Sequence, residues 1–126
     1  MMDIRSEQAL QGVHPDLVRV VRRAYTSISQ PLSFIVTEGL RTRARQEQLY
    51  QQGATRTLNS RHLTGHAVDL AATINDKVRW DWPLYHRLAD AMKDAALVEQ
   101  VAIAWGGDWK TFKDGPHFEL TRKKYP

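Results

Sequence analysis

The stretch SRHLTGHAVDL, residues 60–70, leads from a polar loop through a glycine into an apolar run. Gly65 lets the chain turn, and alternate residues of the following run point to opposite sides if it forms a strand. His62 and Asp69 can therefore converge on one point, one from the loop and one from the strand. Two interpretations stay open for this pair: ordinary polar residues at a turn, or two ligands of a metal ion that needs a third ligand elsewhere.

A third candidate ligand lies in DGPHFEL, residues 114–120. His117 would join His62 and Asp69 as a third protein ligand of zinc and leave the fourth tetrahedral position for water, as in catalytic rather than structural zinc sites. Asp114, three residues earlier, would be placed to take a proton from that water as general base. The chain contains no cysteine, so a transition-metal site must use histidine and carboxylate ligands.

Such chemistry also needs a group that stabilises the negative charge developing on an attacked carbonyl. Arg41 follows an apolar segment that ends at Gly39, and it is the best candidate for this role. Together these residues supply the ligands, general base and positive charge that a zinc peptidase needs, with Zn²⁺ as its cofactor.

Outward from this stretch, the chain alternates between helical and extended patterns. Pro15 and Pro83 suit early helical positions, and Asn75 and Asp76 suit a hairpin turn. We expect an α+β chain forming a small single domain over residues 1–126. Helices are predicted over 14–28, 43–52 and 83–99, and strands over 32–40, 66–72, 101–106 and 116–120.

Composition bounds the class of protein. The chain has 126 residues, with 42% hydrophobic and 25% charged, which is typical of one ordinary globular unit. Its formal charge of +4 favours polyanions without choosing among them. Asp3, Arg5 and Glu7 interrupt the segment where a secretory signal would need an apolar run, and no later run has membrane-spanning length. The sequence therefore predicts a cytoplasmic protein without membrane insertion.

SRHLTGHAVDL resembles the SxHxxGxAxD motif of the zinc D-Ala-D-Ala-type peptidases, the group that contains the VanX and VanY enzymes. Nearly the whole chain, from VTEGLRT (36–42) through AWGGDW (104–109) to DGPHFEL, is similar to the short phage L-alanyl-D-glutamate endopeptidases of that group. The resemblance implies a small α+β domain with a central antiparallel sheet flanked by helices.

The resemblance also implies roles for particular residues. It gives His62, Asp69 and His117 as zinc ligands, Asp114 as the catalytic acid/base, and Arg41 as the group that stabilises carbonyl charge. Many relatives have glutamate at the acid/base position. The Asp-Gly-x-His order found here is similar to the phage branch, and the shorter carboxylate implies a different backbone around the following glycine.

Other residues near these motifs have open or plainer interpretations. Ser60 either binds substrate or orients its loop. His66 shares strand parity with a valine rather than with the aspartate ligand, so we leave it out of the metal site. Trp105 is expected in the core and Trp109 is left undecided. Glu119 shares parity with His117 and is a candidate partner for that histidine.

These expectations describe a zinc-dependent endolysin of phage or prophage origin that cuts the L-alanyl-D-glutamate bond of the peptidoglycan stem peptide. It would be a monomer with a single zinc peptidase domain over residues 1–126 and no separate wall-binding domain. It would accumulate in the host bacterial cytoplasm and reach the wall after a separate membrane-permeabilising protein acts. Two alternatives stay open: a D,D-carboxypeptidase or D-Ala-D-Ala dipeptidase of the same family, and a noncatalytic basic protein that binds wall polymer or nucleic acid. The first hypothesis predicts no nucleic-acid partner.

Overall fold

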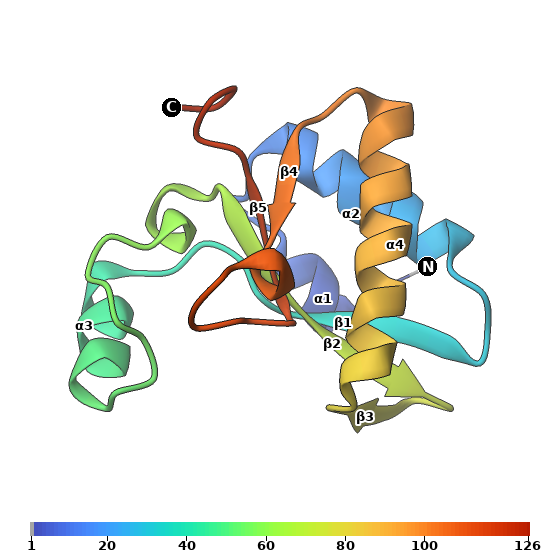
Figure 1. Cartoon of the computed structure of the whole chain (residues 1–126), viewed down its shortest axis with the longest axis horizontal. Coiled ribbons are helices and arrows are strands. Elements are labelled where there is room, and N and C mark those ends of the chain that lie inside the picture. The colour runs from blue at the N-terminus through green and yellow to red at the C-terminus, as the bar shows by residue number, and fades with distance from the viewer. Residues whose placement is uncertain (1) are drawn as a thin grey trace.

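A computed structural model describes residues 2–126 and places helices and a five-stranded sheet around one core (Figure 1). The α-helices are α1 (Ile4–Ala9), α2 (Pro15–Ser27), α3 (Arg43–Gln51) and α4 (Trp82–Glu99), and the short 3-10 helices are η1 (Arg61–Thr64) and η2 (Gly106–Asp108). The strands are β1 (Leu32–Glu38), β2 (Ala67–Ile74), β3 (Lys77–Arg79), β4 (Ile103–Trp105) and β5 (His117–Leu120).

The sheet is antiparallel throughout, in the order β1-β2-β5-β4, with β3 paired to β2. β1 pairs with β2 along one edge, while β5 pairs with residues 67–69 of β2 and β3 pairs with residues 72–74. The hairpin turn at Asn75 and Asp76 has positive φ at both residues, the conformation that favours Asn and Asp there. The α+β class, the antiparallel sheet and the predicted hairpin are thus confirmed.

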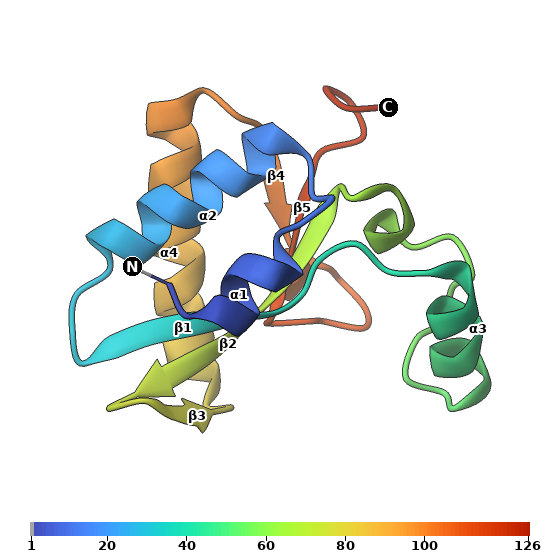
Figure 2. The ribbon, with the colours of Figure 1, turned by 180° about the vertical axis from the view of Figure 1, so that it is seen from behind.

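The core lies between one face of the sheet and the pair of helices α2 and α4, which pack against each other (Figures 1 and 2). Side chains on one stripe of each helix are buried because apolar residues recur there at helical spacing. β1, β2 and β5 contribute their alternate residues to the same core. The largest fully buried apolar side chains are Phe34, Phe118, Leu17, Leu32, Leu70, Leu88, Met92 and Leu120.

The same alternation directs polar residues to the opposite face of the sheet. Val68 and Leu70 are in the core, so Asp69 between them projects away from it, and it pairs with His117 across the β2–β5 ladder. A register shift in β1 aligns Glu38, rather than Thr37, with Asp69. This β-bulge therefore brings a carboxylate to the polar face, as bulges beside functional sites commonly do.

Helix α1 was not among the predicted elements. Its N-cap is Asp3, whose side chain accepts a hydrogen bond from Ser6 N–H at 2.7 Å. The buried Ser6 hydroxyl in turn accepts from the backbone N–H of Val36 at 2.9 Å, which fixes α1 to β1. Within residues 2–126, no helix is both long and apolar enough to cross a membrane.

Candidate metal centre

Three separate elements bring His62, Asp69 and His117 together. His62 lies in η1, Asp69 in β2 and His117 at the start of β5, and one potential ligand atom from each lies within 4.8 Å of the other two. Both histidines are almost fully buried, and Asp69 is partly exposed toward solvent. The loop and the two strands thus place their side chains around a common point, as the spacing predicted.

The hydrogen bonds of the two imidazoles determine which nitrogen faces that point. His62 Nδ1 lies 2.8 Å from the carbonyl oxygen of Gly39, so Nδ1 donates and Nε2 is directed at Asp69. His117 has the opposite arrangement, because its Nε2 lies 2.7 Å from Glu119 Oε1 and its Nδ1 faces Asp69. The contact with Glu119 agrees with the strand-parity prediction, and both outer contacts are of the kind that orient metal ligands.

Two of the three distances between donor atoms match those around a tetrahedral ion, and all three donor atoms lie within 4.8 Å of one another. Asp69 Oδ1 lies 3.2 Å from His62 Nε2 and 3.3 Å from His117 Nδ1. Ligand atoms about 2.0–2.1 Å from a tetrahedral zinc ion lie about 3.3 Å from one another. The donor set of two imidazoles and one carboxylate therefore fits a metal ion, and the cluster is a candidate metal site.

Charge interactions within the cluster shift the ionisation of its members. Burial alone would raise the pKa of Asp69, but hydrogen bonds with His117 and His62 outweigh it and hold that pKa far below its usual range. Burial would lower the pKa of His117, yet its hydrogen bonds with Asp69 and Glu119 raise it to about 9. Without a cation, a proton on His117 therefore supplies positive charge between two carboxylates.

Asp114 lines the cleft next to this cluster and is half-buried. Burial and the nearby Asp69 charge raise its pKa. A tight turn holds it, since the Asp114 carbonyl accepts from His117 N–H at 3.2 Å and Asp114 N–H donates to the Gly106 carbonyl at 3.0 Å. A Cβ on Gly106 would lie 2.4 Å from the Asp114 carbonyl oxygen, so only glycine allows this approach.

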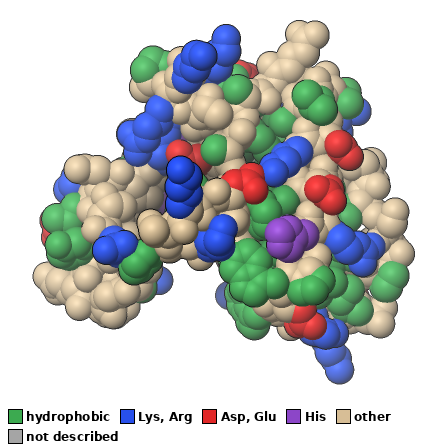
Figure 3. Space-filling view, viewed as in Figure 1, with side chains coloured by type: hydrophobic (Ala, Val, Ile, Leu, Met, Phe, Trp, Pro, Cys, Tyr) green, Lys and Arg blue, Asp and Glu red, His purple; other side chains and the backbone are tan. Residues whose placement is uncertain are grey.

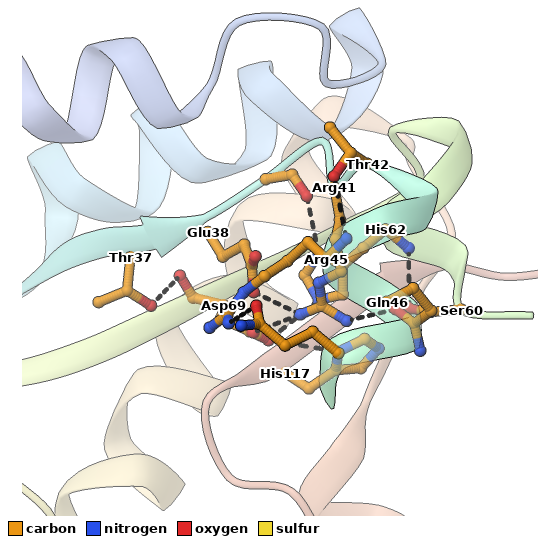
Figure 4. A network of polar contacts seen from close by, with 12 residues as sticks. Thr37, Glu38, Arg41, Thr42, Arg45, Gln46, Ser60, His62, Asp69 and His117 are labelled. Atoms are coloured by element: carbon orange, nitrogen blue, oxygen red, sulfur yellow. Dashed lines mark hydrogen bonds and ion pairs between the residues drawn. The ribbon is translucent and has the colours of Figure 1, made fainter. Parts of the chain in front are cut away.

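Arg41 reaches the cluster from the segment after β1, and its side chain is almost fully buried (Figure 4). Its guanidinium donates to Gln46 Oε1 at 2.8 Å and to Glu38, and lies 3.6 Å from Asp69 Oδ2. Sequence reasoning missed Glu38 and Gln46. The bulge concealed Glu38, and Gln46 is fully buried in a helix of low apolar content, where the sequence pattern gives no sign of burial.

The remaining motif residues have specific contacts. Ser60 caps η1 by accepting from His62 N–H at 3.1 Å, which is the loop-orienting interpretation, and it also lines the cleft. His66 lies outside the ligand cluster, with Nδ1 2.7 Å from Thr64 Oγ1. Trp105 is buried in the core as expected. Trp109, which the sequence left undecided, is partly exposed with its ring 5.1 Å from that of His117.

The cluster opens into a cleft of about 660 Å³. Its walls include the loop after α3 on one side and the 109–114 loop on the other, and Figure 3 shows a hollow between the α3 lobe and the rest of the molecule. Acidic and basic side chains gather above this hollow. The cleft is large enough for a short peptide to reach the metal site.

Comparison with known proteins identifies a peptidase family whose model matches nearly the whole chain. Residues 1–123 match the family model described as phage L-alanyl-D-glutamate peptidase. The L-alanyl-D-glutamate peptidase of Escherichia phage T5 is 32% identical, covering 95% of this chain and 88% of the relative. The L-alanyl-D-glutamate peptidase of Listeria phage A118 is 33% identical over 79% of this chain, but that match spans only 34% of the longer relative.

Solved structures agree with this result. The Serratia marcescens L-Ala D-Glu endopeptidase ChiX superposes with a TM-score of 0.91 and 50% identity, covering 98% of this chain and 91% of ChiX. The vancomycin resistance D,D-dipeptidase VanXYg shares the fold at a TM-score of 0.57 and 21% identity, covering 86% of this chain and 50% of that structure. This chain therefore belongs to the phage L-alanyl-D-glutamate peptidase family.

Proposed function

We propose that this protein is a zinc-dependent peptidoglycan endopeptidase that hydrolyses the L-alanyl-D-glutamate bond of the stem peptide. The observation that carries the proposal is the meeting of His62 Nε2, Asp69 Oδ1 and His117 Nδ1 around one point beside a cleft. Family membership supports the substrate, because the matched relatives are named for that bond. Two imidazoles and one carboxylate favour zinc among the divalent metals.

In this mechanism His62, Asp69 and His117 would hold the zinc ion, which would supply a Lewis acid able to polarise a carbonyl and to increase the acidity of water. Asp114 takes a proton from the attacking water and returns it to the leaving amine of D-glutamate. The burial of Asp114, which raises its pKa, suits it to both steps, because a carboxyl group that binds protons more tightly is a stronger base. Arg41 stabilises the negative charge on the carbonyl oxygen.

Arg41 is suited to this task by its surroundings. Gln46 and Glu38 fix the orientation of its guanidinium before substrate arrives. A fixed cation loses little free energy to reorganisation when charge develops in the transition state. Ser60 holds the backbone of η1, and we assign it a supporting part in the substrate-binding wall of the cleft.

The decisive experiment separates metal binding from turnover. We expect His62→Ala and Asp69→Ala to lose zinc, while Asp114→Asn retains one zinc per chain and loses at least about 100-fold in turnover. Zinc content is measured by elemental analysis, and cleavage by mass spectrometry of products from purified peptidoglycan. Loss of zinc in Asp114→Asn would contradict this division of roles.

Product mapping tests the substrate. New N-terminal D-glutamate after digestion supports the proposal. Release of terminal D-alanine alone would instead identify a D,D-carboxypeptidase or dipeptidase. Binding to wall polymer or nucleic acid without cleavage, unchanged by EDTA and by His117→Ala, would identify a noncatalytic protein.

We also propose a cellular setting for the enzyme, supported by its two phage relatives. One zinc peptidase domain acts as a monomer, accumulates in the host bacterial cytoplasm, and reaches the wall after a separate protein permeabilises the membrane. Expression in bacteria should cause lysis only when a membrane-permeabilising protein is induced with it. Lysis by the enzyme alone would contradict this order of events, and size-exclusion chromatography with light scattering tests the monomer.

A further inference from the structure

Some of the charged side chains that line the cleft already form hydrogen bonds or ion pairs within the protein, and others do not. Arg41 is held by Glu38 and Gln46, and Arg61 donates to the backbone carbonyls of Leu120 and Tyr125 at 3.0 and 2.7 Å. Arg41 is already assigned to the carbonyl oxygen of the scissile bond, and Arg61 holds the segment after β5 in place, so neither guanidinium is available for a further carboxylate. A negatively charged substrate must therefore find its cation elsewhere on the wall.

Arg56 is such a cation. It lies in the loop after α3 and lines the cleft, and its guanidinium carbon lies 3.8 Å from the ring centroid of Phe112 on the opposite loop. Among the residues that the structure describes, no carboxylate forms an ion pair with it. A guanidinium over an aromatic ring keeps its N–H edge free to bind a carboxylate while the ring limits its orientation.

Two other cations near the cleft are placed less favourably. Arg122 lines the cleft from the segment that follows β5, close enough to Glu119 and Arg61 to interact with both electrostatically. Lys113 donates to the backbone carbonyls of Gly107 and Trp109 at 3.3 and 2.9 Å. Arg56 is thus the cation that combines an open carboxylate-binding edge with contact to the loop that carries the acid/base.

The chemistry of the substrate places a carboxylate beside that loop. Asp114 must reach the leaving nitrogen, which belongs to D-glutamate, and Phe112 lies two residues before Asp114. A glutamate within a peptide chain uses one carboxyl group for the next amide bond and keeps the other free. That free carboxylate is only a few bonds from the leaving nitrogen, so it must lie near the loop that Arg56 contacts.

We propose that Arg56 binds the free carboxylate of the substrate's D-glutamate and so determines specificity for this residue on the leaving-group side of the bond. The inference rests on the proposed function and adds the residue that recognises the substrate. A planar guanidinium can form two parallel charge-assisted hydrogen bonds with a carboxylate. An amide of the same shape offers only one acceptor oxygen and carries no charge. Arg56 should therefore bind it more weakly, which makes the amide peptide a suitable control.

The test compares two synthetic stem peptides that differ only in this group, one with D-glutamate and the other with its free carboxylate converted to the amide. We expect the wild-type enzyme to favour the carboxylate peptide by about tenfold or more in kcat/KM, and Arg56→Gln to abolish that preference. Arg56→Lys should keep part of it, because the charge remains but the planar fork is lost. Phe112→Ala should keep most of it.

The control is Arg45→Gln, which removes the same charge from an exposed position on α3 outside the cleft lining. It should leave the preference at its wild-type value. Thermal melting and zinc content of each variant exclude effects on folding. An equal loss by Arg56→Gln on both peptides, or a wild-type enzyme indifferent to the amide, would overturn the inference. Failure of wild type to cleave either peptide at its L-alanyl bond would instead reject the proposed function.

Discussion

Replacing Glu119 by alanine tests how much the surroundings of a ligand contribute to metal binding. Glu119 Oε1 lies 2.7 Å from Nε2 of His117, and the burial of the histidine keeps water from substituting well for the lost carboxylate. A hydrogen bond to a charged group contributes about 1.5–3 kcal/mol, and 1.4 kcal/mol corresponds to about a factor of ten in affinity. We therefore expect Glu119→Ala to weaken zinc binding about 10- to 100-fold.

The assay is competition for zinc against a chelator of known affinity, at fixed pH. Glu119→Gln should lose less than Glu119→Ala, because the amide oxygen still accepts the hydrogen bond but lacks the charge. Glu47→Ala, at an exposed position of α3, is the control and should bind zinc as wild type does. Zinc affinity unchanged in Glu119→Ala, with the fold intact, would refute the idea that this contact orients His117.

Other predictions concern stability. Ser6→Ala leaves the buried Val36 N–H without its partner, and should lower the free energy of unfolding by about 1–3 kcal/mol in urea titrations. Gly65→Ala should cost at least about 2 kcal/mol in the same assay, because φ is +74° there and a Cβ would lie 2.3 Å from the Gly12 carbonyl oxygen. In the metal-free protein the pKa of His117 rises from 6.5 to about 9, so its stabilising contribution is complete below pH 6.5 and is lost as pH rises through about 9. Thermal melts of metal-free protein should show this loss, and His117→Ala should remove it.

Much of the fold follows from sequence patterns, for reasons visible in particular residues. The helices and strands predicted from periodicity begin and end within two residues of the observed ones. Pro15 lies in the first turn of α2, and Pro83 in the first turn of α4, where Asp81 is the N-cap residue. Asn75 and Asp76 form the hairpin turn that their residue types predict. These features depend on local backbone preferences, which a sequence records directly.

Features that depend on distant contacts could not be predicted in this way. Helix α1 is six residues long, too short to be stable by itself, and its link to Val36 joins parts of the chain 30 residues apart. The position of Glu38 depends on a bulge that strict alternation does not reveal. The contact between Arg56 and Phe112 requires two loops to meet, and the local sequence of neither loop predicts that contact.

Because Asp69 pairs with His117 across β2 and β5, the two side chains come together only when the last strand joins the sheet. β5 is the last strand along the sequence, yet it lies inside the sheet between β2 and β4. A chain that ends before residue 117 lacks both one of the three proposed metal ligands and the strand that joins β2 to β4. In the proposed enzyme, metal binding would therefore require the finished sheet, and a molecule that ends before residue 117 would be inactive.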